Sequence, residues 1–245
     1  MFPLKRYIYQ ELVQIRNNLL LELEHDLDQK LAKELVNYNK HIFEHLGPML
    51  IIAYTKQNSG YDKAKDFVIA IYLLLLAHHI HQNRKELNNF NLLLGDYCFS
   101  KFYNYLIQRD LQEWITVFSQ LICQLQEAAV IKTHNNLQNL SQSLTEEMVD
   151  KDYANLCSLC SYIGASLNHL KRSSLIEHQN FGLNLGRTYY LCQLGLAPSL
   201  AKLFLAQATS GLVLINDSEL QYTMFKLLNF LGTKINKSLK KELAF

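Results

Sequence analysis

The sequence has few of the residues that interrupt regular backbone structure. Only 9 of its 245 residues are glycine and 3 are proline, about 5% together against about 12% in average proteins. β-Sandwiches, β-barrels and nucleotide-binding α/β sheets need many glycine and proline turns, so this scarcity excludes them. Leucine, a strong helix former, makes up about a fifth of the chain. The composition therefore predicts an all-α protein.

Long apolar runs, charge of one sign and a disulfide pattern are also missing. The longest apolar run covers 67–77, about half of the 20 residues that a membrane span needs. The net charge of +2 is too small for electrostatic binding to nucleic acid. The five cysteines are odd in number and lie in apolar segments, as reduced thiols do. With no signal-peptide pattern at the start, we expect a cytoplasmic protein without a membrane span or a nucleic-acid partner.

Apolar residues recur at helical spacing along most of the chain and predict about nine or ten helices and no strand. The first pattern covers 4–38, and one stripe of it holds Ile8, Leu12, Ile15, Leu19 and Leu23. A helix over 62–81 is apolar on every side from 67 to 77, which predicts a central buried helix. Asp217 is expected to cap the last helix. Because no linker or repeat interrupts these patterns, we expect one helical domain over 1–245.

Two clusters have the spacing of metal or redox sites. His78 and His81 share a helix face, as zinc ligands can, but position 82 is glutamine and no third ligand is signalled nearby. Cys157 and Cys160 have the spacing of a redox pair, but they lie inside a continuous apolar segment and no second pair exists. We predict no bound metal. An enzyme with chemistry relocated to the region of His78 and His81 stays open as an alternative.

Several segments, in order, resemble the trans-polyprenyl diphosphate synthases. The segment 70–83 is similar to the family helix that ends in His-Asp-Asp, with His81 at the histidine. The others are 46–50 (LGPML), similar to the end of GKRLRPML; 93–97 (LLGDY), similar to a Gly-Asp-Tyr helix start; and 162–167 with 181–186 (YIGASL and FGLNLG), similar to Gly-Ala-x-Leu and Tyr-Gly-x-x-Leu-Gly. The resemblance implies a helical bundle of the isoprenoid synthase type.

The residues that hold metal and phosphate in that family are replaced here. Family members bind magnesium through two Asp-Asp-x-x-Asp motifs, because Mg²⁺ prefers carboxylate oxygens. The first motif is degenerate, with Gln82, Asn83 and Glu86, and the second begins at Gln193. The basic cradle of the family is replaced by Glu44, His45 and Gly47, and its lid helices are missing between 196 and 201. The resemblance therefore implies no catalytic residues and no cofactor on this chain.

By this resemblance, the chain is a non-catalytic subunit of a two-component synthase like the heptaprenyl and hexaprenyl enzymes. It would be inactive alone, pair as a heterodimer with a catalytic subunit that carries the magnesium, and help to set chain length for quinone side chains such as that of menaquinone. Candidate residues for the chain-length wall are Leu74, Leu75, Ala77 and His78. Candidate interface residues are Phe99, Phe102, Tyr103, Leu106, Trp114 and Phe118, with Phe102 expected on an exposed face.

The alternative is a stand-alone homodimeric pseudoenzyme that binds an apolar prenyl lipid or a protein partner. An aromatic-rich surface of this kind suits a sizeable obligate interface in either assembly. The sequence does not distinguish the two.

Overall fold

The computed structural model describes residues 6–38, 42, 45–55, 59–82, 89–135, 137–215 and 217–242, and these residues form helices and no strand. The α-helices of the first half are α1 (Arg6–Glu24), α2 (Gln29–Tyr38), α3 (Leu46–Thr55), α4 (Tyr61–Gln82), α5 (Asn89–Gln108) and α6 (Ile115–His134). Those of the second half are α7 (Gln142–Val149), α8 (Asn155–Leu167), α9 (Arg172–Leu194), α10 (Pro198–Gly211) and α11 (Ser218–Glu242). The expectation of an all-α chain is confirmed.

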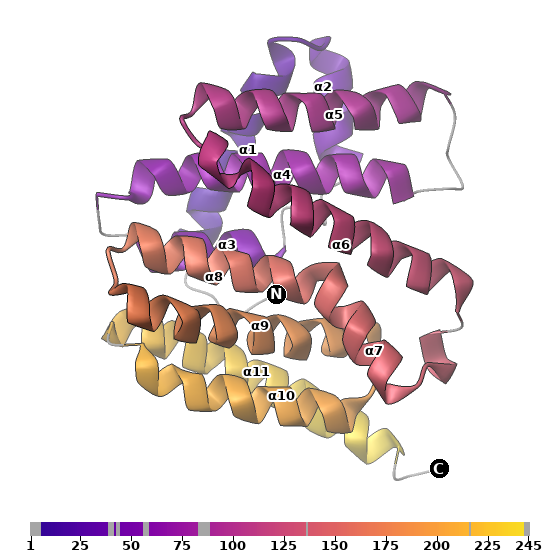
Figure 1. The fold of residues 1–245 in the computed structure, drawn as a ribbon, viewed down its shortest axis with the longest axis vertical. Coiled ribbons are helices and arrows are strands. Elements are labelled where there is room, and N and C mark those ends of the chain that lie inside the picture. The colour runs from indigo at the N-terminus through magenta and orange to yellow at the C-terminus, as the bar shows by residue number, and fades with distance from the viewer. Residues whose placement is uncertain are drawn as a thin grey trace.

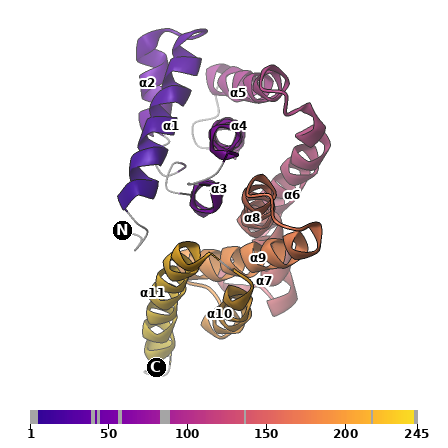
Figure 2. The same ribbon diagram turned by 90° about the vertical axis from the view of Figure 1, so that its left-hand side faces the viewer.

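The helices are stacked roughly side by side. α2 and α5 lie at one end of the molecule, α4 and α6 cross its middle, and α10 and α11 lie at the other end (Figure 1). A view from the side shows α1 and α2 covering one flank of α4 while α6 curves around the other flank (Figure 2). The helix that the sequence predicts to be central is therefore enclosed by its neighbours.

α4 is buried on every side along most of its length. Every side chain from Phe67 to His78 is buried in the described structure, so the prediction of a central helix is confirmed. A helix without a polar face cannot lie at a surface, and burial of its leucines and isoleucines supplies about 1.5–3 kcal/mol each. Gln82, the first residue of the expected degenerate motif, ends α4, so this helix fixes the position of the candidate site.

The first apolar pattern is two helices, not one helix over 4–38. The stripe from Ile8 to Leu23 is buried as expected, but α1 ends at Glu24 and α2 begins at Gln29. The Asp28 carboxylate starts the second helix by accepting a hydrogen bond from the backbone N–H of Lys30 at 2.9 Å. Such an N-cap satisfies a backbone donor that the first helical turn leaves unpaired.

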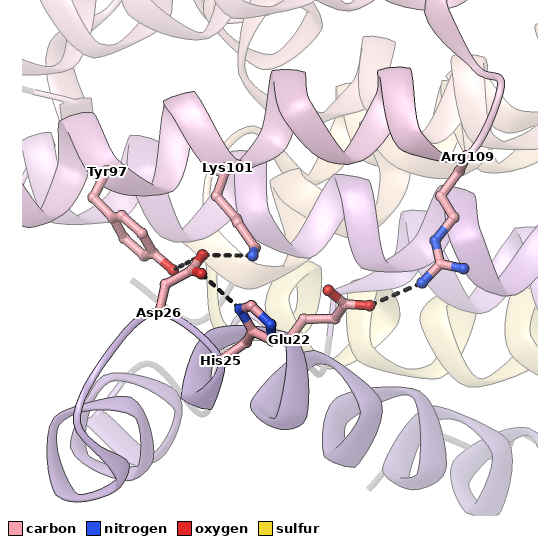
Figure 3. Close-up of polar contacts among 6 residues, drawn as sticks. All are labelled: Glu22, His25, Asp26, Tyr97, Lys101 and Arg109. Atoms are coloured by element: carbon pink, nitrogen blue, oxygen red, sulfur yellow. Dashed lines mark hydrogen bonds and ion pairs between the residues drawn. The ribbon is translucent and has the colours of Figure 1, made fainter.

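Side chains of α5 hold the turn between α1 and α2 in place (Figure 3). Asp26 accepts hydrogen bonds from Lys101 at 2.6 Å and from Tyr97 at 3.2 Å. The hydrogen bond from Lys101 lowers the pKa of Asp26 to about 2, and His25 adds to this shift. Arg109 donates to Glu22 one turn earlier, at 2.8 Å. These exposed ion pairs add little stability, but they fix the register of α1 against α5.

α8 and α9 pack closely because glycines stand at their crossing. A side chain at Gly182 would lie 2.6 Å from the backbone carbonyl oxygen of Cys157, and one at Gly186 would lie 2.9 Å from the Cα of Ala154. Gly164 makes room in the same way for the ring of Tyr54 on α3. The glycines that carry the sequence resemblance are thus required by helix contacts.

The end of the chain follows the predicted capping pattern. Asp217 accepts hydrogen bonds from the backbone N–H groups of Glu219 and Leu220, at 2.8 and 2.9 Å, and begins α11. Pro198 stands in the first turn of α10, where its missing N–H costs no helical hydrogen bond. One feature is not signalled by the sequence: a π-helical turn, Asp150–Ala154, joins α7 to α8.

Candidate functional site

The C-terminal end of α4 is packed against the beginning of α5. The His81 imidazole lies against the backbone of Gly95, where a Cβ atom would clash with it. Its Nε2 is 3.3 Å from a carboxylate oxygen of Asp96, and its ring lies 5.4 Å from that of Phe99. Glycine and aspartate at 95 and 96 therefore position the histidine that the resemblance singles out.

The described residues at the expected motif positions do not fit a magnesium site. Gln82 donates from its amide to Gln126 of α6 at 3.1 Å, and Gln193 is exposed near the end of α9. Neutral amides replace the carboxylates that magnesium requires at these two positions. Asn83 and Glu86 lie outside the described residues, as does Glu44. Gly195, in the left-handed conformation, ends α9, and α10 begins at Pro198, so a short turn joins the two helices where the resemblance implies that lid helices are missing.

Aromatic rings fill the space between α3, α9 and the π-helical turn. The Tyr153 ring stacks on the Tyr190 ring with centroids 4.6 Å apart, and its centroid is 4.5 Å from that of His45. His45 accepts the backbone N–H of Gly47 at Nδ1, at 3.1 Å, and its Nε2 lies 2.8 Å from the hydroxyl of Tyr190. The neutral tautomer with a proton on Nε2 satisfies both contacts. The resemblance places His45 where family members have a phosphate-binding cation. Here its imidazole is instead hydrogen-bonded to the Tyr190 hydroxyl.

The charged groups beside these rings are paired with one another. Lys132 of α6 forms an ion pair with Asp152, which is almost fully buried. Burial raises the pKa of Asp152, and the Lys132 ammonium opposes that rise. Asp150 accepts two hydrogen bonds from the Arg187 guanidinium, each at 2.6 Å. The π-helical turn places both aspartates, so its carboxylates are committed to cations of the chain itself.

His78 is the one histidine in this region whose ring nitrogen has no described partner. Its Nδ1 is buried without a hydrogen bond among the described residues, and its ring lies edge-on to Tyr153 with centroids 6.4 Å apart. Burial lowers the pKa of His78 to about 4, and the nearby Lys132 contributes. The imidazole is therefore neutral at physiological pH.

A pH-dependent loss of stability follows from this burial. Because the pKa of His78 is lower in the folded than in the unfolded chain, the unfolded state gains protons first as the pH falls below 6.5. Between pH 7.5 and pH 5 we expect this group to lower the free energy of unfolding by about 2 kcal/mol. Urea unfolding of the wild type and of His78→Leu at both pH values measures the difference. An equal pH dependence in the two proteins would contradict a neutral, buried His78.

The described residues contain no group of three or more histidine, cysteine, aspartate or glutamate side chains that could hold a metal ion. Cys157 and Cys160 are fully buried in α8, and burial raises the pKa of both thiols well above its ordinary value. Protonated, buried thiols are poor nucleophiles and poor ligands. Neither the pair His78 and His81 nor the pair Cys157 and Cys160 has a geometry that supports a relocated catalytic site.

The candidate residues for chain length and for the interface fall into two groups. Leu74, Leu75, Ala77 and His78 are buried along α4, and no described feature identifies them as the wall of a tunnel. Of the interface candidates, Phe99, Tyr103 and Trp114 are partly buried. Phe102, Leu106 and Phe118 are fully buried in the chain's own core, with the rings of Phe102 and Phe118 5.5 Å apart. The expectation that Phe102 is exposed is wrong.

A different set of apolar side chains points outward from α5 and α6. Six of the thirteen exposed large apolar residues in the described structure lie on these two helices: Phe90, Leu92, Leu93, Ile107, Val117 and Val130. The segment 112–134 is apolar and long enough to cross a membrane by composition, as α4 is, but only 22% of its most apolar window is buried, against 78% for α4. We call the six residues the α5/α6 face.

No protein-family model and no curated protein matches the sequence. Solved structures do match it. A polyprenyl synthase from Caulobacter crescentus CB15 is 13% identical, with a TM-score of 0.75, over 92% of this chain and 95% of that one. A heterotetrameric geranyl pyrophosphate synthase from mint is 14% identical over 89% and 98%, with a TM-score of 0.70. The geranyl diphosphate synthase small subunit of Antirrhinum majus is 15% identical over 87% and 98%, with a TM-score of 0.62. The chain thus has the all-α isoprenoid synthase fold.

Proposed function

We propose that this chain is a non-catalytic subunit of a two-component, long-chain trans-polyprenyl diphosphate synthase. In this assembly a second subunit with both aspartate motifs would bind magnesium and carry out elongation in the cytoplasm. This chain would dock on that subunit, stabilise it and help to set the length of a prenyl chain made for a quinone such as menaquinone.

The observation that carries the proposal is the absence of suitable charge at the described motif positions. Gln82 and Gln193 offer neutral amides, whereas ionisation of a diphosphate needs carboxylates that gather metal ions around it. The nearby carboxylates of Asp150 and Asp152 are paired with Arg187 and Lys132. A metal could recruit these aspartates only by breaking ion pairs inside the chain, and breaking a buried pair is costly.

The α5/α6 face supports the docking part of the proposal. Its apolar side chains lie exposed on α5 and α6, and only 22% of the most apolar window of 112–134 is buried; exposed apolar surface of this kind marks a place where a partner can dock. Two of the structural neighbours are parts of heteromeric synthases by their names, one a heterotetrameric enzyme and one a small subunit. We therefore propose a catalytic subunit of the same fold as the partner of this face.

A role in chain length would act through α4. Leu74, Leu75 and Ala77 lie in the turns before Gln82 and are fully buried, so enlarging or shrinking them changes the packing around the helix that ends at the degenerate motif. We propose that these residues and His78 influence product length indirectly, by fixing the position of α4 and of α5, which packs on α4 and carries part of the proposed interface.

The same face is available to a second copy of this chain. A homodimer that binds a prenyl lipid or a protein partner is the alternative function, and the α5/α6 face would then be self-complementary. Sedimentation of the purified chain alone and with a synthase that carries both aspartate motifs distinguishes the two assemblies. Exchange of homodimers for heterodimers on mixing favours the two-component enzyme.

Partial repair of the first motif should not create activity. The double variant Gln82→Asp, Asn83→Asp restores two acids. It leaves Asp150 and Asp152 in their ion pairs and the short turn after α9 unchanged. Because catalytic groups that act as a unit are strongly non-additive, the pure variant should make no polyprenyl diphosphate above the background of the wild type. The assay uses labelled isopentenyl diphosphate, an allylic diphosphate and magnesium. Turnover by either pure protein would overturn the non-catalytic assignment.

A further inference from the structure

The C-terminal part of the chain differs in charge from the rest. Residues 198–242, which hold α10 and α11, contain six lysines and three acids, Asp217, Glu219 and Glu242. The remaining residues hold 18 basic and 19 acidic side chains. Because α10 and α11 form one end of the molecule (Figure 1), this end is positive while the rest of the chain is slightly negative.

α11 is amphipathic, and its outer face combines lysines with aromatic rings. The inner face, from Leu220 through Leu227 to Ile235, is buried against the fold. The exposed side chains that share the opposite face are Tyr222, Phe225, Lys226, Asn229, Thr233 and Lys237. Residues 220–241 contain no acid. We call these six exposed side chains the outer α11 face.

Four described lysines of this end have no described carboxylate within ion-pair distance: Lys202, Lys226, Lys234 and Lys237. Lys226 instead holds its ammonium 4.4 Å from the centroid of the Tyr222 ring, and Lys234 lies 5.1 Å from that of Phe230. An ammonium that lies over an aromatic ring is attracted to the ring face but keeps its full positive charge.

From these observations we infer that the outer α11 face docks on an anionic lipid surface. A helix with a buried apolar side normally presents a mixed polar side to water, whereas the outer α11 face presents two lysines without a described carboxylate partner, two exposed aromatic rings and no acid. Lysines are attracted to negatively charged headgroups, and aromatic side chains favour the boundary between headgroups and acyl chains. The surface lies on a different helix from the α5/α6 face, so lipid and partner subunit would not compete.

Vesicle co-sedimentation of the full chain tests this inference. With vesicles of phosphatidylcholine that contain about a third phosphatidylglycerol, at about 0.1 M salt, the wild type should bind, and it should not bind pure phosphatidylcholine. Lys226→Ala with Lys237→Ala should weaken binding by about 25-fold, since each lysine near such a surface contributes a factor of about five. Phe225→Ser alone should weaken binding by about fivefold, because the ring no longer enters the headgroup layer.

The matched control is Lys30→Ala with Lys33→Ala, which removes the same charge from exposed positions on α2. The control should bind as the wild type does. Equal losses in the two double variants would mean that net charge alone acts, and the assignment to α11 would be wrong. Absence of vesicle binding, or equal binding to neutral vesicles, also overturns it. So does binding of poly-glutamate but not of vesicles through Lys226 and Lys237, which would identify an acidic protein as the partner.

Discussion

The double variant Leu93→Glu, Val130→Glu should lose its affinity for a catalytic synthase subunit by a factor of a hundred or more. Both side chains are exposed on the α5/α6 face, Leu93 by 68% and Val130 by 53%. In a docked complex each glutamate would be an unpaired carboxylate in an apolar contact, a penalty of a few kcal/mol. Since every 1.4 kcal/mol is a factor of ten in affinity, titration calorimetry with the partner should resolve the loss easily.

The chain offers a closely matched control on another flank. Leu21 and Val13 of α1 are exposed by 64% and 55%, so Leu21→Glu with Val13→Glu makes the same chemical change away from the face. Both double variants should keep the helical circular dichroism of the wild type. If the control loses as much affinity as the test variant, or if the test variant binds normally, the partner does not dock on α5 and α6.

The variant Lys132→Met should lower the free energy of unfolding by about 3–5 kcal/mol at neutral pH, because it leaves a buried carboxylate without its partner. The affected group is Asp152, whose pKa burial already raises. Without the ammonium, that pKa rises further, and the folded state of the variant takes up a proton as the pH falls. The deficit relative to the wild type should therefore shrink between pH 8 and pH 5.

A second substitution separates lost charge pairing from lost packing. Asp152→Leu added to Lys132→Met removes the unpaired charge, and apolar replacement of both partners of a buried pair is often neutral or stabilising. Urea unfolding of both variants at the two pH values is the measurement. A deficit in Lys132→Met that is independent of pH, or that persists in the double variant, would mean that the charge of Asp152 is not what costs stability.

Much of the fold could be predicted because single segments determine it. α4 is apolar on every side, so it must be central, and Asp217 caps α11 with its own side chain. The turn after α1 could not be predicted in this way. His25 and Asp26 interrupt an apolar stripe that continues on both sides of them, and Asp26 is held by Lys101, 75 residues away. The first pattern is two helices because this tertiary contact holds the turn after α1 and the Asp28 N-cap then starts α2.

The interface residues show the same limit. α5 carries aromatic side chains on several faces, so its sequence does not reveal which face meets α6 and which meets solvent. The structure buries Phe102 against Phe118, although the sequence analysis expected Phe102 to be exposed. The exposed apolar side chains of α5 include Leu93 and Ile107 instead. The interior pairs Lys132–Asp152 and Arg187–Asp150 were likewise not predictable, because each joins residues from different helical segments through a π-helical turn that the sequence does not signal.

The most direct test of the account is elongation by reconstituted subunits. The measurement compares the purified chain, a synthase that carries both aspartate motifs, and their mixture, each with labelled isopentenyl diphosphate, an allylic diphosphate and magnesium, and resolves products by length. The account predicts no product from the chain alone, and from the mixture a higher rate or a longer, narrower set of products than from the synthase alone. Elongation by the pure chain, or a mixture whose rate and product lengths equal those of the synthase alone, would contradict it.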